Sequence, residues 1–145
     1  MNIVLIGYRG TGKSVVGQVL ADKLGMDLEG MDANIVQRAG MSIPEIVEKD
    51  GWDRFREIET QEALALAQKD NQVIDSGGGV IERPQNMEAL GKTGTVFWLT
   101  ASVETIVARI QDDTQRPALV KGKTFTEEVA EVLEKRESRY RAASD

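Results

Sequence analysis

The amino-acid sequence predicts an α/β protein in which helices cover both faces of a parallel β-sheet. Two observations carry this prediction. Short apolar runs, each suited to a buried strand, alternate along the chain with segments of helical spacing. The first run also passes through a glycine-rich turn directly into a helical segment. With 145 residues, the chain fits one domain, residues 1–145, built around one core.

Four segments are expected to form strands. The first, residues 3–6, is rich in β-branched side chains and stops at Gly7, as in a central strand that is buried on both faces. The third stops at three consecutive glycines, Gly77, Gly78 and Gly79. The predicted strands are residues 3–6, 27–31, 72–75 and 95–99.

The helical segments are bounded by recognisable caps and breaks. The first spans residues 15–24, with Gly25 at the expected C-cap. Residues 33–69 are expected to be helical with breaks at Gly40, at Ser42 before Pro44, and at Gly51. Further helices are expected over residues 103–111 and 126–140, and the polar segment 112–123 between them is expected to form a mobile flap.

Composition excludes several classes of function. The net charge of −6 and the isoelectric point near 4.8 disfavour nonspecific binding to nucleic acid or to an anionic membrane. Without cysteine or histidine, acid–base chemistry must fall to carboxylates, lysine or tyrosine. The apolar run near the N-terminus is too short for a signal peptide or a membrane span, so we expect a cytoplasmic protein.

Residues 7–14 match the phosphate-binding motif G-x-x-x-x-G-K-[ST], known as the P-loop, between a predicted strand and a predicted helix. Backbone N–H groups of such a loop turn inward around phosphate oxygens, and the helix N-terminus adds partial positive charge. Lys13 would reach the β- and γ-phosphates, and the hydroxyl of Ser14 would bind Mg²⁺. The alternative is a glycine turn that only caps a helix. The expected nucleotide-binding residues are Gly10, Thr11, Gly12, Lys13, Ser14 and Val15.

Other chemistry-bearing residues are predicted to meet the P-loop at one edge of the sheet. Asp32 follows the second strand and the triple glycine follows the third, and the carboxyl ends of parallel strands gather at one edge. Asp32 and three charged residues elsewhere in the chain also have purely structural interpretations. Asp32 could cap a helix that begins at Ala33. Arg56 and Glu59 could form a solvated ion pair, and Arg136 could lie on a solvent-exposed helix face. The triple glycine instead indicates a close approach of the backbone to another group.

Together these motifs resemble the shikimate kinase family, over residues 1 to about 140. The resemblance is carried by five motifs in order: residues 2–14, residues 40–46, Gly51 with Phe55, Arg56 and Glu59, the triple glycine, and Arg116–Pro117. It implies a three-layer P-loop fold with strand order 2-3-1-4. Residues 33–69 would form the acceptor-binding helices and residues 112–123 a lid.

The resemblance also implies ATP-dependent phosphorylation of a shikimate hydroxyl. Asp32 would hold the acceptor hydroxyls and assist proton removal, while Arg56 and Arg136 would pair with the carboxylate of the acid. Gly77, Gly78 and Gly79 would approach the ring hydroxyls, and Glu59 would hold Arg56 in place. Two further arginines are implied, Arg109 against adenine and Arg116 as the lid arginine over the phosphates.

The sequence departs from the family pattern in several places. Gly30 stands where the family has the first aspartate of Asp-x-Asp, and Asp75 stands where it has Ser or Thr, so we hypothesise that Asp75 supplies the missing carboxylate for magnesium. The family also continues past residue 140 into a last strand that this sequence does not contain. We expect a monomer, and the sheet edge exposed without that strand makes a dimer the alternative.

Two other readings remain open. The chain could be a kinase of another small acid, such as gluconate, or of a nucleoside monophosphate. The arginine and aspartate set favours a carboxylated polyol over a nucleotide, because a nucleotide would need a base pocket. The chain could also be a kinase-like binding module that has kept the pocket and lost turnover. The intact Lys13, Ser14 and Arg116 argue against this last reading.

Overall fold

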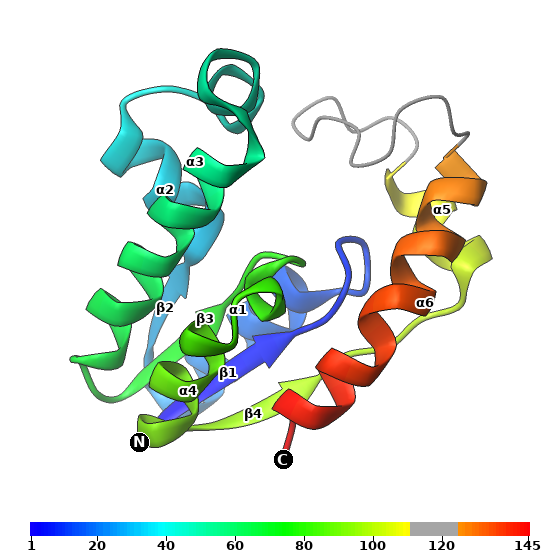
Figure 1. Cartoon of the computed structure of the whole chain (residues 1–145). Coiled ribbons are helices and arrows are strands. Elements are labelled where there is room, and N and C mark those ends of the chain that lie inside the picture. The colour runs from blue at the N-terminus through cyan, green and yellow to red at the C-terminus, as the bar shows by residue number, and fades with distance from the viewer. Residues whose placement is uncertain (111–124) are drawn as a thin grey trace.

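The computed structural model describes residues 1–110 and 125–145 (Figure 1). Within them a four-stranded sheet is covered by helices on both faces. The elements in chain order are β1 Asn2–Ile6, α1 Lys13–Leu24, β2 Asp27–Gly30, α2 Met31–Ala39, α3 Ile43–Ala67, β3 Gln72–Asp75, the 3-10 helix η1 Val80–Glu82, α4 Pro84–Thr93, β4 Gly94–Trp98, α5 Val103–Ile110 and α6 Phe125–Ala143.

The four strands are parallel and lie in the order β2-β3-β1-β4, as predicted. Their carboxyl ends are aligned, because Leu5 in β1 pairs with Asp75 in β3, and Asp75 pairs with Gly30 in β2. The loops that leave these strands therefore begin at the same edge of the sheet.

Each face of the sheet packs against its own set of helices. Alternate residues of β1 point to opposite faces, so Leu5 packs with Val73 and Ala21 of α1, whereas Val4 belongs to a cluster on the other face. That second cluster joins α3, α4 and α6, and it includes Ala63, Leu66, Leu90 and Tyr140. Figure 1 shows α1 and α4 on opposite sides of the sheet. These contacts explain why both faces of β1 are apolar.

Helices α2 and α3 form an arm that rises from the β2 side of the sheet, opposite α5 and α6 (Figure 1). The arm has its own apolar cluster, in which Ile35 of α2 packs with Ile46 and Phe55 of α3. A capping box between Ser42 and Glu45 begins α3, and the Ser42 hydroxyl lowers the pKa of Glu45 by hydrogen bonding. Gly51 bends α3 with φ 83° and ψ 172°, at the predicted break.

Several boundaries differ from the predicted ones. Strand β2 ends at Gly30 and α2 begins at Met31, so the Asp32 side chain lies in the first helical turn instead of capping it. The sequence analysis assigns nothing to the segment that forms η1 and α4. The predicted lid, residues 112–123, lies outside the described residues. No helix in the described part of the chain is long and apolar enough to cross a membrane.

Candidate functional site

A cavity of about 830 Å³ opens at the carboxyl edge of the sheet, between the α2–α3 arm and α5. The P-loop forms one wall, the start of α2 another, and the turn after β3 a third. The lining includes most of the residues that the sequence predicted for the site: Gly10, Thr11, Gly12, Lys13, Ser14, Val15, Asp32, Asp75, Gly77, Gly78 and Arg109. The topology therefore brings nucleotide-binding and acceptor-binding candidates to one place.

The P-loop backbone has the open geometry that phosphate binding requires. Gly7, Gly10 and Gly12 have φ of 142°, 83° and 99°, which L side chains rarely adopt. A side chain on Gly7 would also meet the carbonyl oxygen of Leu99 at 2.4 Å. Gly12 occupies the N-cap of α1 without a side-chain cap, so the first N–H groups of the helix face the cavity rather than a capping group.

Lys13 folds back over the loop it belongs to. Its Nζ donates to the carbonyl oxygens of Gly7 and Tyr8, at 2.8 and 3.0 Å, and the residue is buried. The two hydrogen bonds hold the ammonium group at the floor of the cavity before any ligand binds. A phosphate entering the loop meets a positioned cation and does not have to order a free lysine.

Ser14 and Asp75 meet at the same floor. The Ser14 hydroxyl donates to Oδ2 of Asp75 at 2.6 Å. Burial raises the pKa of Asp75, and the nearby charge of Asp32 adds to this, whereas the Ser14 hydrogen bond and Lys13 lower it. Hydroxyl and carboxylate oxygens are ligands that Mg²⁺ accepts, and it commonly takes one or two carboxylates together with phosphate and water. The pair therefore fits a magnesium site completed by nucleotide phosphates.

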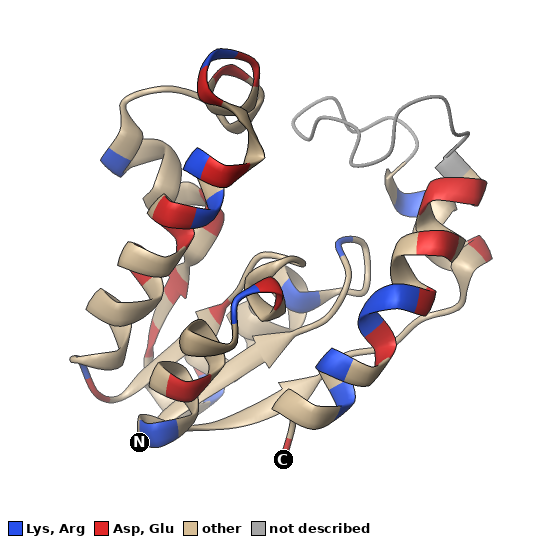
Figure 2. Ribbon diagram, viewed as in Figure 1, with Lys and Arg blue, Asp and Glu red and all other residues tan. Residues whose placement is uncertain are grey.

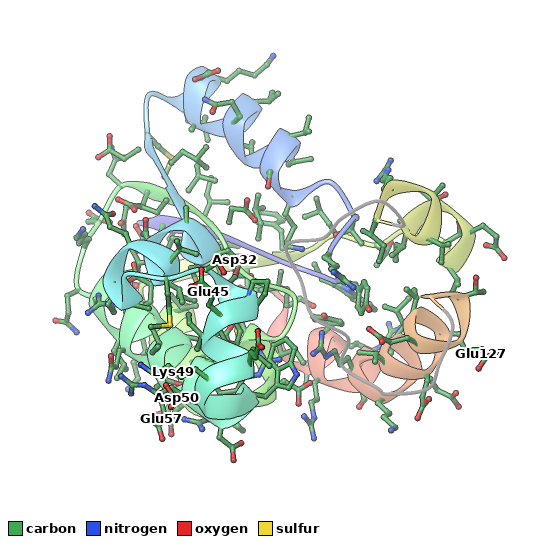
Figure 3. All side chains as sticks on the ribbon, turned by 90° about the horizontal axis from the view of Figure 1, so that it is seen from above. Asp32, Glu45, Lys49, Asp50, Glu57 and Glu127 are labelled. Atoms are coloured by element: carbon green, nitrogen blue, oxygen red, sulfur yellow. The ribbon has the colours of Figure 1, made fainter. Side chains whose placement is uncertain are left out.

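Asp32 projects from the first turn of α2 toward the middle of the molecule, whereas Glu57 of the same arm lies at its margin (Figure 3). Because the cap position of α2 is Gly30, the interpretation of Asp32 as a helix cap is wrong. Asp32 lines the cavity, half-buried, close enough to Asp75 to influence its pKa.

Glu59 is buried and Arg56 is largely covered, so the interpretation of this pair as a solvated one is wrong. Their side chains are 12% and 0% exposed, and the guanidinium donates from Nη1 to Oε1 of Glu59 at 3.0 Å. The guanidinium also lies over the ring of Trp52, with Cζ 5.3 Å from the ring centroid. Arg56 is not among the residues lining the cavity, but it reaches the turn after β3, where it packs against Gly79.

Arg136 is likewise buried, although it stands within a run of charged residues on α6. Its Nε donates to Oε1 of Glu82 at 2.8 Å, and Nη1 lies 3.6 Å from the position that a Cβ on Gly78 would take. Tyr140, one turn further along α6, donates its hydroxyl to the carbonyl oxygen of Gly78. The glycine turn is thus approached by the backbone of the P-loop and by two side chains of α6, which confirms that its glycines permit close contact.

The buried hydroxyl of Tyr140 predicts a loss of stability at alkaline pH. Burial raises its pKa from 10.0 to about 12. Since the folded pKa exceeds the unfolded one, the stabilisation is present below pH 10 and is lost as the pH rises toward 12, by up to about 3 kcal/mol. Urea unfolding at several pH values should show this loss in the wild type and less of it in Tyr140→Phe. Equal pH slopes for the two proteins would contradict the assignment.

Of the remaining predicted residues, Arg109 lies at the mouth of the cavity. Its Nη1 donates to the carbonyl oxygen of Gly10 at 2.8 Å, and the side chain is exposed. This places a cation at the open end of the P-loop. Arg116, predicted as the lid arginine, lies outside the described residues.

Three further charged residues, which the sequence does not mark, line the cavity or hold residues of the candidate site. Arg9 lines the cavity from within the P-loop, and its Nη2 lies 4.0 Å from Oε1 of the buried Glu128 on α6. The carboxylate of Glu82 accepts hydrogen bonds from the guanidinium groups of both Arg136 and Arg139. Arg9 occupies a variable position of the motif, and Glu82 and Glu128 are distant in sequence from their partners. Figure 2 shows acidic and basic residues mixed along α3 and α6, so charge runs do not mark these partners.

Comparison with known proteins gives consistent matches. The family model described as shikimate kinase matches residues 9–145. The shikimate kinase of Geobacter sulfurreducens is 44% identical over 139 residues, which cover 96% of this chain and 76% of the relative. The shikimate kinase of Thermodesulfovibrio yellowstonii is 44% identical over 142 residues, covering 98% and 82% of the two chains.

Solved structures agree with the sequence matches. Shikimate kinase from Acinetobacter baumannii, in complex with shikimate, aligns with a TM-score of 0.94 and 34% identity. The alignment covers 99% of this chain and 79% of that one. The fold described above is therefore shared with a shikimate kinase whose structure was solved in complex with shikimate.

Proposed function

The chain belongs to the shikimate kinase family, and on that premise we propose that it transfers the γ-phosphate of ATP to a hydroxyl of shikimate. One observation carries the proposal. The P-loop with Lys13, the carboxylate of Asp32 and the turn after β3 line one cavity, and the guanidinium groups of Arg56 and Arg136 reach that same turn. A polyphosphate and a small hydroxylated acid can therefore lie side by side.

The acceptor would be held by groups of matching chemistry. Two arginines, Arg56 and Arg136, offer planar forks for the carboxylate, and each is oriented by its own glutamate. Asp32 is placed to accept hydrogen bonds from ring hydroxyls. A hydroxyl-rich ring with one carboxylate fits this set better than a nucleoside monophosphate does. A base would need an apolar slot, whereas Asp32 and two of the glycines line the acceptor end of the cavity and the guanidinium groups of Arg56 and Arg136 adjoin it.

The transfer itself would depend mainly on position and charge. In-line attack by the acceptor oxygen on the γ-phosphorus forms the new P–O bond as the bond to the bridging oxygen of ADP breaks. The proton of the hydroxyl would pass to Asp32. Backbone N–H groups of residues 10–15 and the ammonium group of Lys13 would stabilise the charge that develops on the phosphate oxygens. Arg109 would contact the adenine, and Arg116 would cover the phosphates.

Magnesium would be held by Ser14 and Asp75 together with phosphate oxygens. When bound, it would neutralise charge on the β- and γ-phosphates. The strand register supports a shifted carboxylate, because Asp75 pairs directly with Gly30, the position where the family has its aspartate. A side chain at the end of β3 is thus one strand away from the usual position.

Asp75→Asn is therefore expected to raise the magnesium concentration needed for half-maximal activity by about tenfold, since one anionic ligand becomes neutral. A titration of ADP release against MgCl₂ measures this at saturating ATP and acid. Asp27→Asn, at the exposed start of β2, serves as the control because it lies away from the cavity. An unchanged magnesium dependence in Asp75→Asn would contradict the hypothesis that Asp75 binds magnesium.

A coupled assay of ADP release tests the function as a whole. Turnover with shikimate, and not with gluconate or nucleoside monophosphates, is the expected result. Turnover with one of the other acceptors would assign a different kinase activity. Binding of shikimate and ATP without turnover would indicate a binding module.

We also propose that residues 1–145 act as one kinase domain, as a monomer in the cytoplasm, where ATP is available. Sedimentation at micromolar concentration distinguishes this from a dimer formed through β4.

A further inference from the structure

The third glycine of the turn after β3, Gly79, has an ordinary backbone conformation. Its φ of −95° and ψ of 12° are open to any L residue, unlike the left-handed glycines of the P-loop. Backbone geometry therefore does not explain why the residue is glycine. The surroundings do, because a Cβ at this position would lie 2.2 Å from Nη1, 2.4 Å from Nη2 and 2.5 Å from Cζ of Arg56.

The guanidinium of Arg56 has little room to move aside. It is hydrogen-bonded to Glu59, which is fully buried, and it lies over the rings of Trp52 and Phe55, with Cζ 5.3 and 5.2 Å from the ring centroids. Only 12% of the Arg56 side chain is exposed. Ordinary carbon contacts begin near 3.4 Å, so a methyl group on Gly79 would displace the guanidinium by more than 1 Å.

We infer that Gly79 is a positioning residue for the acceptor. Its missing side chain leaves the space that the Arg56 guanidinium occupies, and so fixes where the carboxylate of the acceptor is bound. The inference rests on the proposed function and deepens it, because it assigns selection of a carboxylated acceptor to the pair of Arg56 and Gly79. Gly78 differs, since the nearest atom to a Cβ there is the backbone nitrogen of Arg9 at 3.3 Å.

The variant Gly79→Ala tests the inference by steady-state kinetics. Displacing a binding group by about 1 Å is expected to raise KM for shikimate by about 10- to 100-fold. The KM for ATP should change less than twofold, because the three atoms nearest to a Cβ on Gly79 all belong to Arg56 and none to the P-loop. Gly91→Ala on α4 is the matched control, since a Cβ there meets nothing within 4 Å and should leave both constants unchanged.

A double-mutant cycle separates this role from a direct contact between Gly79 and the acceptor. In an Arg56→Ala background, Gly79→Ala should raise KM no further, because the group it displaces is already gone. The melting temperature of the double variant should equal that of Arg56→Ala, since the methyl group of Ala at position 79 then has space. Full additivity of the two KM effects would overturn the inference, and so would an unchanged KM in Gly79→Ala alone.

A crystal structure of Gly79→Ala keeps this test independent of the proposed function. If the wild type does not phosphorylate shikimate, the proposed function fails, but the position of Arg56 can still be compared with the wild type. A guanidinium displaced by 1 Å or more supports the inference. A guanidinium left in place beside the new methyl group overturns it.

Discussion

Replacing Lys13 with alanine is expected to lower kcat about 1000-fold while KM for shikimate changes little. The ammonium group lies buried at the floor of the cavity, fixed by the carbonyl oxygens of Gly7 and Tyr8, where it can neutralise charge that develops during transfer. A positioned group that acts on the transition state affects kcat and kcat/KM together. Steady-state release of ADP at varied shikimate and ATP measures both constants.

The control for this variant is Lys23→Ala in the same helix, whose side chain is exposed and far from the P-loop. It removes the same charge from the protein and should leave kcat unchanged. Circular dichroism should show that Lys13→Ala remains folded. A Lys13→Ala protein that is folded and retains a tenth of wild-type kcat would contradict the role given to Lys13.

Arg56→Ala should raise KM for shikimate about 100-fold and lower the free energy of unfolding by about 3 kcal/mol or more. The first effect follows from losing a bidentate, charge-assisted contact with the carboxylate. The second follows because Glu59, fully buried, loses its ion pair with Arg56. Kinetics and urea unfolding measure the two effects separately.

Two further variants isolate these effects. Arg54→Ala removes a neighbouring arginine that is 46% exposed and paired with the exposed Glu57, so it should change neither quantity appreciably. Arg56→Ala with Glu59→Gln leaves no buried carboxylate at position 59 and should recover part of the lost stability without recovering KM. Recovery of both would mean that Arg56 acts on the fold and not on the acceptor.

The strands and the P-loop could be predicted because their signals are local. The run that ends at Gly7, the motif through Ser14 and the break at Gly51 each need only a few neighbouring residues to be recognised. Helix α4 begins at Pro84, a residue favoured in the first helical turn, but no side-chain cap precedes it and its apolar residues are few. These local signals are too weak to predict the helix.

The partners of the site residues could not be predicted, because they are distant in sequence. Arg136 is 54 residues from Glu82, and the hydroxyl of Tyr140 reaches Gly78 across 62 residues. Burial that arises from tertiary packing also changed the meaning of local patterns. In the sequence, Arg136 stands in a run of charged residues that predicts a solvated helix face. The packing of α6 against η1 and the glycine turn nevertheless buries it.

The aromatic contacts of the site provide optical reporters. The sequence has two tryptophans, and they lie next to different residues of the candidate site. Trp52 lies beneath the guanidinium of Arg56, while Trp98 stacks on Tyr140 at 5.8 Å between ring centroids. Intrinsic fluorescence of a Trp98→Phe protein would thus follow events around Arg56, and that of Trp52→Phe would follow events around the glycine turn, without any added dye.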